Sequence, residues 1–250
     1  MSNKVLLIGA NGFVGRALQA ELKQQGISFN AIGRNSKVQP AAGAQISDDK
    51  LQDAAYFESL LDDAGVVIHV ASASTPGGSA GKPLHELESN LRPTLALLEA
   101  LQSAPRVRLI YVSSGGTLIH RPPSQSDEYQ AVYSRSYHGA GKVAAEQFVQ
   151  AWSEQFSGQA TIVRPSNLYG PGQFERSGFG IVPAAMGRLI RKQELHIWGD
   201  GSTCRDYLYI DDFISLLLKI LQAPSPSGCR IFNACSGQST SLNELLDLTE

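Results

Sequence analysis

The apolar positions of the chain follow two patterns that alternate along its length. Continuous apolar runs, which are typical of strands covered on both faces of a parallel sheet, occupy residues 5–8, 29–32, 66–71, 108–112 and 160–163. Stretches with helical spacing lie between them, for example at residues 13–23, 83–102 and 142–156. Strands and helices of these lengths predict right-handed βαβ units and an α/β fold with a doubly wound parallel sheet.

A glycine-rich turn joins the first apolar run to the first helical stretch, and it has the spacing of a dinucleotide site. Gly9 permits a tight turn, Gly12 lets the backbone approach a pyrophosphate, and Gly15 lets the helix pack close to the sheet. The amino end of the helix then offers N–H groups to the phosphates. We therefore expect a Rossmann fold that binds NAD or NADP through Gly9, Asn11, Gly12, Phe13, Val14 and Gly15.

The end of the second strand distinguishes NAD from NADP in such domains. An acidic residue there binds the ribose 2′-hydroxyl group, whereas an arginine can accommodate a 2′-phosphate group. The chain reads Gly33-Arg34-Asn35 and carries no carboxylate at this position. Arg34 therefore favours NADP, with the alternative that its side chain only covers the adenine ring.

Glycine and proline become frequent after Arg164, which changes the character of the chain. They crowd residues 165–183 and recur at 224–228, where they indicate loops, and a new helix is expected to start near Ser241. We expect an NAD(P)-binding Rossmann domain in residues 1–165. A substrate-binding region in residues 166–250 is expected to be partly interleaved with it.

Composition excludes several other classes of protein. The net charge is −2 and no Lys/Arg run occurs, which argues against nucleic acid and membrane surfaces as partners. No apolar run approaches the length of a membrane span, and the first is too short for a signal peptide. Cys204, Cys229 and Cys235 fit no metal-ligand spacing, and their odd number suits a reducing compartment. We expect free thiols, no metal site and a cytoplasmic protein.

Four further segments follow the glycine turn in order. They are Val67-Ile-His-Val-Ala71, Val112-Ser-Ser-Gly-Gly-Thr117, Arg164-Pro-Ser-Asn-Leu-Tyr-Gly-Pro-Gly172, and Trp198-Gly-Asp-Gly with Arg205-Asp-Tyr-Leu-Tyr-Ile-Asp-Asp212. Together with the turn they resemble the extended short-chain dehydrogenase/reductase family, in its NAD-dependent epimerase/dehydratase branch, which includes UDP-galactose 4-epimerase. The resemblance covers essentially the whole chain. Its motifs are specific to the branch and much less so to one substrate.

The resemblance implies binding roles for residues beyond the glycine turn. Further cofactor contacts would come from Leu51, Val70, Ala71, Asn90, Lys142 and Pro165. Asn167 would touch the sugar or diphosphate of a nucleotide-sugar, and Arg205 would grip the diphosphate, for which a planar guanidinium is suited. The alternative for Arg205 is a surface ion pair with Asp206. Family members often form homodimers and have a longer C-terminal part, so the pocket could be more open or the natural chain could continue past Glu250.

The resemblance also implies a catalytic centre. In the family a tyrosine takes a sugar hydroxyl proton, a lysine four residues later lowers the tyrosine pKa, and a serine or threonine shares the proton. The spacing places tyrosine and lysine on one helix face. Here Lys142 matches the lysine, but His138 lies four residues before it and Tyr137 five, which rotates Tyr137 by about 100° on a regular helix. Ser114 is the first choice for the hydroxyl, followed by Ser113 and Thr117.

Three explanations of this departure stay open. A bulge or a tighter turn could bring Tyr137 into place. His138 could itself be the base, since a histidine pKa near 6.5 suits that task. The site could also be catalytically weak.

The leading functional prediction is C4 epimerisation of a UDP-hexose through a transient 4-keto intermediate. An NADPH-dependent nucleotide-sugar reductase is the second enzymatic possibility, favoured by Arg34, whereas Gly115-Gly116 argues against a dehydratase, which carries an acidic pair there. A non-catalytic NAD(P)-binding sensor is the alternative from another class. Lys142, Asn167 and Arg205 argue against a sensor, because it would not need to grip a sugar diphosphate.

Overall fold

The structure is a computed structural model. It describes residues 4–34, 44–46, 50–118, 127–128, 130, 132–175, 180–197, 199–225 and 227–248.

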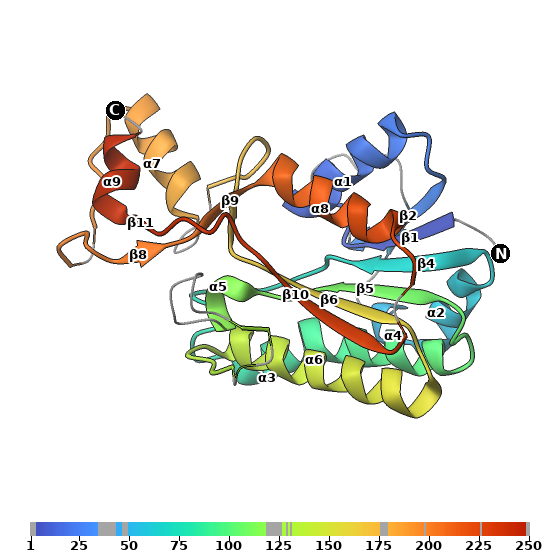
Figure 1. Cartoon of the computed structure of the whole chain (residues 1–250). Coiled ribbons are helices and arrows are strands. Elements are labelled where there is room, and N and C mark those ends of the chain that lie inside the picture. Colours follow the sequence, from blue (N-terminus) through green and yellow to red (C-terminus); the bar gives the residue numbers. More distant parts are fainter. Residues whose placement is uncertain are drawn as a thin grey trace.

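A parallel sheet forms the centre of the described part of the chain (Figure 1). Its strand order is β10-β6-β5-β4-β1-β2-β3, and each neighbouring pair is parallel. The strands are β1 (Lys4–Ile8), β2 (Phe29–Arg34), β3 (Ala44–Ile46), β4 (Ala64–His69), β5 (Arg108–Val112), β6 (Ala160–Pro165) and β10 (Cys229–Ala234). The order reverses between β1 and β4, which gives the doubly wound arrangement predicted from the sequence.

Helices cover both faces of this sheet. Helices α1 (Phe13–Gln24) and α8 (Ile210–Gln222) lie on one face, and α2 (Ala54–Leu61), α4 (Arg92–Gln102) and α6 (Tyr137–Phe156) lie on the other (Figure 1). Each face has its own apolar cluster: Leu18 and Phe213 are fully buried in one, Phe57 and Leu97 in the other. No helix among the described residues is long and apolar enough to cross a membrane.

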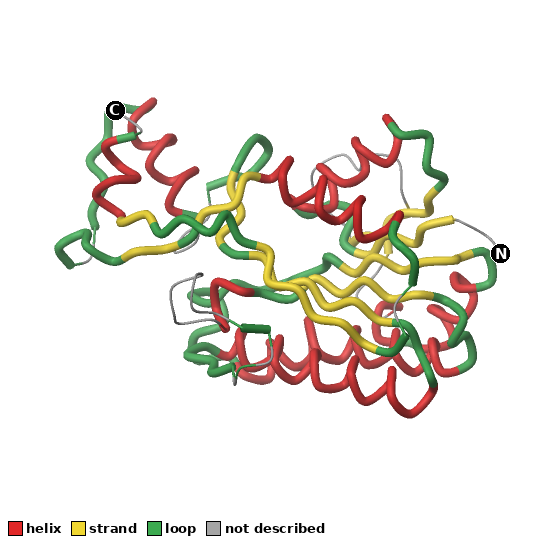
Figure 2. Tube along the Cα trace, in the orientation of Figure 1, coloured by secondary structure: helices red, strands yellow, loops and turns green. Residues whose placement is uncertain are grey.

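A smaller region lies beside the carboxyl ends of the central strands (Figure 2). It contains β7 (Asn167–Tyr169) paired with β9 (Tyr207–Tyr209), and β8 (Cys204–Arg205) paired with β11 (Thr240–Ser241). Helices α7 (Ile181–Ile190) and α9 (Leu242–Asp247) complete it. Because α8 and β10 leave this region and pack into the central layers, its chain segments are interleaved with the Rossmann sheet.

Two details of the sequence prediction are wrong. Helix α6 begins at Tyr137, because Ser136 accepts a hydrogen bond from the Gly139 N–H at 3.1 Å and caps the helix. Gly139 and Gly141 have low helix propensity, yet both lie inside this helix, before the predicted start at residue 142. The predicted helix over residues 83–102 is also divided, into α3 (Pro83–Glu86), a π-helical turn η2 (Leu87–Leu91) and α4. Such turns are frequent at functional sites.

Candidate active site

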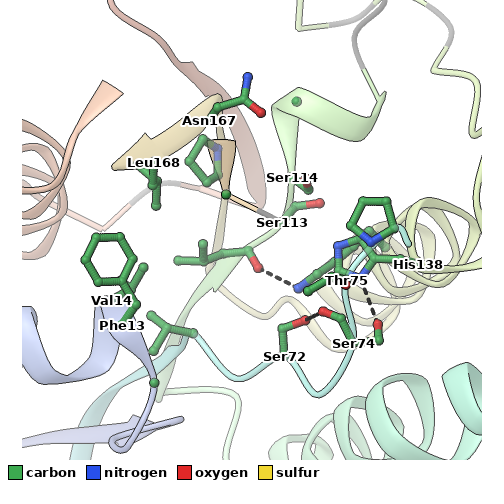
Figure 3. A pocket seen from close by; sticks show the side chains of 18 of the residues that line it. Phe13, Val14, Ser72, Ser74, Thr75, Ser113, Ser114, His138, Asn167 and Leu168 are labelled. Atoms are coloured by element: carbon green, nitrogen blue, oxygen red, sulfur yellow. Dashed lines mark hydrogen bonds between the residues drawn. The ribbon is translucent and has the colours of Figure 1, made fainter. Parts of the chain in front are cut away.

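A deep cleft of about 2070 Å³ runs along the carboxyl ends of the central strands, between the glycine turn and the smaller region. Ligands of open α/β sheets bind at this edge. Pockets for single small ligands have volumes of about 300–1,000 Å³, so this cleft has room for two ligands side by side. Figure 3 shows Phe13 and Val14 on one side of the cleft, with Ser113, Ser114 and His138 on the other.

The turn between β1 and α1 needs glycine at two positions, because a Cβ atom at either one would overlap neighbouring backbone atoms of the protein. This tight turn brings the amino end of α1 to the edge of the cleft, where a dinucleotide could bind. Gly9 has a φ of +102°, and a Cβ atom there would lie 2.6 Å from the Ala71 nitrogen. A Cβ atom on Gly15 would lie 2.1 Å from the Gly9 oxygen. Gly12 caps α1 without a side-chain hydrogen bond, so the first N–H groups of the helix are left to a ligand.

Side chains from α1 fix this turn. Gln19 is buried and donates to the carbonyl oxygens of Ala10 at 2.8 Å and Gly15 at 3.3 Å. Arg16 donates to the Asn11 oxygen and to the Gly172 oxygen, both at 2.9 Å. The turn is therefore held in shape and tied to the loop that follows β7.

Other predicted cofactor contacts also line the cleft: Leu51, Val70, Ala71, Asn90, Lys142 and Pro165. The side chains of Arg34 and Thr117 and the whole of Trp198 lie outside the described residues. The preference for NADP that Arg34 favours therefore stays a prediction.

Lys142 and His138 lie one turn apart on the same face of α6, and both are buried side chains that line the cleft. The Lys142 ammonium donates to the Val112 oxygen at 3.0 Å and lies 3.5 Å from the Tyr111 hydroxyl. Burial lowers the pKa of Lys142 to about 8, against the opposing effect of Glu86 and Glu146. Lys142 thus supplies a buried ammonium group that lines the cleft.

Burial is also the main cause that lowers the pKa of His138, to about 4, and the Lys142 charge adds to this effect. The imidazole is therefore neutral near pH 7 and able to accept a proton. The backbone N–H of His138 donates to the Ser79 hydroxyl at 3.1 Å, which anchors the first turn of α6.

The Tyr137 side chain does not lie on the helix face that carries His138 and Lys142. It is 45% exposed and does not line the cleft, because α6 is a regular helix at this position. The structure thus brings His138, not Tyr137, onto the face of Lys142, and no bulge rotates Tyr137 into place.

Two polar residues behind His138, Glu86 and Ser74, were not identified from the sequence, and both contact Asn90, which was predicted as a cofactor contact. Glu86 at the end of α3 is 2% exposed, and the Ser74 hydroxyl donates a short hydrogen bond to its carboxylate. Asn90 on η2 donates to Ser74 at 3.0 Å and to Glu86 at 2.9 Å. The Asn90 Oδ1 atom accepts from the Ala73 N–H at 2.6 Å. The four-residue spacing of Glu86 and Asn90 was the available signal, since it places both on one helix face.

The serine candidates and a buried histidine surround the base of the cleft. Ser114 and Ser113 both line it, and the Ser113 hydroxyl is buried with no hydrogen-bond partner among the described residues. His69 at the end of β4 packs on the Tyr111 ring at a centroid distance of 5.4 Å. Burial, reinforced by the Lys142 charge, lowers the pKa of His69 to about 3, so this ring is neutral.

The predicted diphosphate contacts Asn167 and Arg205 belong to the smaller region and line the cleft, where Asn167 lies next to Gly116. The Asn167 side-chain amide donates to the backbone carbonyl oxygen of Asp206 at 2.8 Å. The Arg205 guanidinium donates to the backbone carbonyl oxygen of Cys204 at 2.8 Å. The Asp206 carboxylate instead accepts hydrogen bonds from Ser236 and Gly237. The exposed Arg205 guanidinium therefore lines the cleft without the surface pair that was the alternative.

A buried ion pair supports the helix that carries the site. The Arg164 guanidinium on β6 contacts the Glu146 carboxylate on α6 through three hydrogen bonds, the shortest of 2.6 Å. Both side chains are at least 96% buried. Within the described part of the chain, no group of three or more His, Cys, Asp or Glu residues could hold a metal ion.

Comparison with known proteins identifies the family. The model of the NAD dependent epimerase/dehydratase family matches residues 5–235. UDP-glucose 4-epimerase of Mycolicibacterium smegmatis is 27% identical over 254 residues, which cover 97% of this chain and 80% of that protein. GDP-6-deoxy-D-mannose reductase of Pseudomonas aeruginosa is 29% identical over 255 residues, which cover 99% and 79%.

Solved structures share the fold. UDP-glucose 4-epimerase of Thermus thermophilus in complex with NAD matches with a TM-score of 0.86 at 22% identity, covering 98% of this chain and 82% of that chain. The family match, the glycine turn and the order of the strands agree with one another. The chain is therefore an enzyme that belongs to the NAD-dependent epimerase/dehydratase family.

Proposed function

We propose that this enzyme is a nucleotide-sugar epimerase that inverts C4 of a UDP-linked hexose through a transient 4-keto intermediate. The observation that carries the proposal is the pairing of His138 and Lys142 on one face of α6, where both line a cleft large enough for a dinucleotide and a nucleotide-sugar. The UDP-glucose 4-epimerase among the relatives supports the choice of substrate class.

The residues of the chain divide the binding between two walls of the cleft. The glycine turn and the amino end of α1 would hold the pyrophosphate of the cofactor, and Lys142 would donate to the nicotinamide ribose. Arg205 and Asn167 would bind the diphosphate of the substrate. When bound, a nicotinamide dinucleotide supplies the acceptor, and later the donor, of a hydride at the sugar carbon.

His138 would move the proton that accompanies the hydride. The neutral imidazole accepts the proton of the C4 hydroxyl group while the carbonyl forms, and it returns the same proton when the opposite face of the ketone is reduced. Ser114 would hold the sugar oxygen by a hydrogen bond during both steps. Atoms and electrons balance over the cycle, so no external reductant is consumed.

An NMR time course of the purified protein with UDP-, GDP- and dTDP-hexoses tests the proposal. Each sugar is incubated once with NAD and once with NADPH. We expect redox-neutral conversion of one UDP-hexose to its C4 epimer. Cofactor binding without conversion of any sugar would contradict the proposal and favour a non-catalytic sensor.

A reductase is the second candidate, because a relative that is 29% identical to this chain is a GDP-6-deoxy-D-mannose reductase. It would consume NADPH in proportion to a keto-sugar and would not act on a hexose without a keto group. The same experiment separates it from the epimerase when keto-sugars are added to the panel. Equilibrium binding of NAD and NADP in parallel tests the NADP preference that Arg34 predicts.

A further inference from the structure

The network of Glu86, Ser74 and Asn90 has no part in the chemistry just described, although it lies directly against His138. The His138 Nδ1 atom is 2.9 Å from the Ser74 hydroxyl oxygen and 4.0 Å from the Glu86 Oε1 atom. A carboxylate that is 2% exposed is costly to bury, so a fold retains it where hydrogen bonds and a charge partner compensate.

The donors and acceptors of this network fix the direction of each hydrogen bond. The Ala73 N–H can only donate, so the Asn90 atom that it contacts is the amide oxygen, and the Asn90 NH₂ group must face Ser74 and Glu86. Ser74 has one hydrogen and two lone pairs. It donates its hydrogen to Glu86 and accepts one hydrogen bond from Asn90. Its remaining lone pair can only accept from His138.

This assignment places the hydrogen of the neutral imidazole on Nδ1. The other ring nitrogen, Nε2, then carries a lone pair, and it is the nitrogen that remains for the cleft that His138 lines. A neutral histidine with the opposite tautomer would present an N–H group there and could not accept a proton.

A glycine on α6 lets the carboxylate come this close. A Cβ atom on Gly141 would lie 2.8 Å from the Glu86 Oε1 atom, so any larger residue would displace the Glu86 side chain from this position. Glycine destabilises a helix interior, and here it makes room for Glu86 next to His138 and Lys142.

We propose that Glu86, acting through Ser74, is a positioning residue that holds His138 as the Nδ1–H tautomer and stabilises its protonated form during turnover. The role in turnover rests on the proposed epimerase function, whereas the tautomer does not. The charges that act on His138 are Glu86 from α3 and Lys142 from its own helix. They oppose each other: Lys142 disfavours the imidazolium ion and Glu86 favours it.

Nitrogen-15 NMR of the histidine rings in the full-length protein tests the tautomer without any turnover. Ring nitrogens with and without a hydrogen have well-separated shifts, and the His138→Gln variant identifies the His138 signals. We expect the Nδ1–H form in the wild-type protein at pH 7. We also expect loss of this preference in Ser74→Ala and in Glu86→Gln. Glu99→Gln, which removes an exposed carboxylate from α4, should leave the spectrum unchanged. An Nε2–H form in the wild-type protein would overturn the inference.

Steady-state kinetics test the effect on the reaction. In metal sites, loss of a carboxylate that orients a histidine lowers activity by about 10–100-fold, and we expect a loss of similar size in the kcat of Glu86→Gln, with the sugar KM within about two-fold of the wild type. The acid limb of the pH profile should move to lower pH, because the variant lacks the charge that favours the imidazolium ion. An unshifted limb would overturn the role in turnover. An Nδ1–H form in a protein that converts no sugar would refute the proposed function and leave the tautomer assignment standing.

Discussion

His138 and Tyr137 are neighbours in the chain but have opposite environments. A helix rotates by about 100° per residue, so a side chain four residues before Lys142 lies on the same face as Lys142, whereas one five residues before does not. His138 is 7% exposed and Tyr137 is 45% exposed. The imidazole is already deprotonated at neutral pH, as an unshifted tyrosine would not be, but its pKa of about 4 makes it a weaker base than a histidine near 6.5.

The two side chains should therefore differ sharply in their effect on catalysis. We expect His138→Gln to lower kcat for the epimerised sugar by about 10²–10⁴-fold, the usual contribution of a general base. Tyr137→Phe should stay within about two-fold of the wild type. Steady-state assays at saturating cofactor measure both variants, and circular dichroism checks that each is folded. A large loss in Tyr137→Phe with little loss in His138→Gln would reverse the assignment of the base.

The turn between β1 and α1 works as a unit, because its backbone is packed against itself. The position of a Cβ atom on Gly15 would overlap the Gly9 carbonyl group, so α1 could not start where it does. This contact sets the direction of the first N–H groups of α1, which would bind the pyrophosphate in the proposed function.

Gly15→Ala should consequently lose both stability and cofactor binding. We expect overpacking to lower the free energy of unfolding by about 1–3 kcal/mol. We also expect the dissociation constant for the dinucleotide to rise at least about tenfold. Gly26→Ala is the matched control: its φ is +66° but no atom lies within 4 Å of the added Cβ atom. The control should lose about 1–2 kcal/mol from backbone strain and keep its affinity. Urea unfolding and calorimetric titration measure the two effects, and unchanged affinity in Gly15→Ala would disprove the argument.

Helix α6 carries His138 and Lys142, and the Arg164–Glu146 pair attaches it to strand β6 of the central sheet. Removing one member of a buried pair leaves an uncompensated charge, which costs about 3–5 kcal/mol, whereas replacing both by apolar residues is often nearly neutral. The position of the proposed catalytic face thus depends on an ion pair one helical turn beyond Lys142 on the same face of the helix.

We expect Arg164→Met and Glu146→Leu each to lower the free energy of unfolding by about 3–5 kcal/mol. The double variant should be more stable than either single variant. Glu88→Gln, which breaks an exposed pair with Arg92, should cost about 0.5 kcal/mol or less. Urea unfolding of the four variants measures these differences. Additive losses in the double variant would mean that the two side chains act independently.

The architecture of the molecule was largely predictable, because it depends on short-range patterns. Buried apolar runs marked the inner strands, and glycine spacing marked the dinucleotide turn. Strands β3 and β10, at the two edges of the sheet, were not predicted; β10 lacks a continuous buried run because it alternates between partly buried and exposed residues. The family resemblance supplied Lys142 and pointed to His138 as a candidate.

The network behind His138 could not be predicted, because its contacts join distant parts of the chain. Ser74 and His138 are separated by 64 residues, and Ser74 and Glu86 by 12. The start of α6 also depends on such contacts: Gly139 and Gly141 weaken the helix locally, while Ser136 and Ser79 fix its first turn. Sequence patterns thus locate the cleft, whereas the protonation state of its base is set by packing between elements.

The response of the molecule to acid follows from two buried neutral histidines. The pKa values of His69 and His138 in the folded state are about 3 and about 4, below the ordinary value of 6.5. Between those values and pH 6.5 the unfolded chain binds more protons, so the free energy of unfolding falls as the pH is lowered. For His69 the loss between pH 7 and pH 5 is about 2 kcal/mol. We expect the free energy of unfolding of His69→Phe, which keeps a ring against Tyr111, to fall by about 2 kcal/mol less than that of the wild type over this pH range. The exposed-site control His85→Gln should lose as much stability as the wild type. Urea unfolding at both pH values checks this, and an equal loss in His69→Phe and wild type would show that His69 is not the acid-sensitive group.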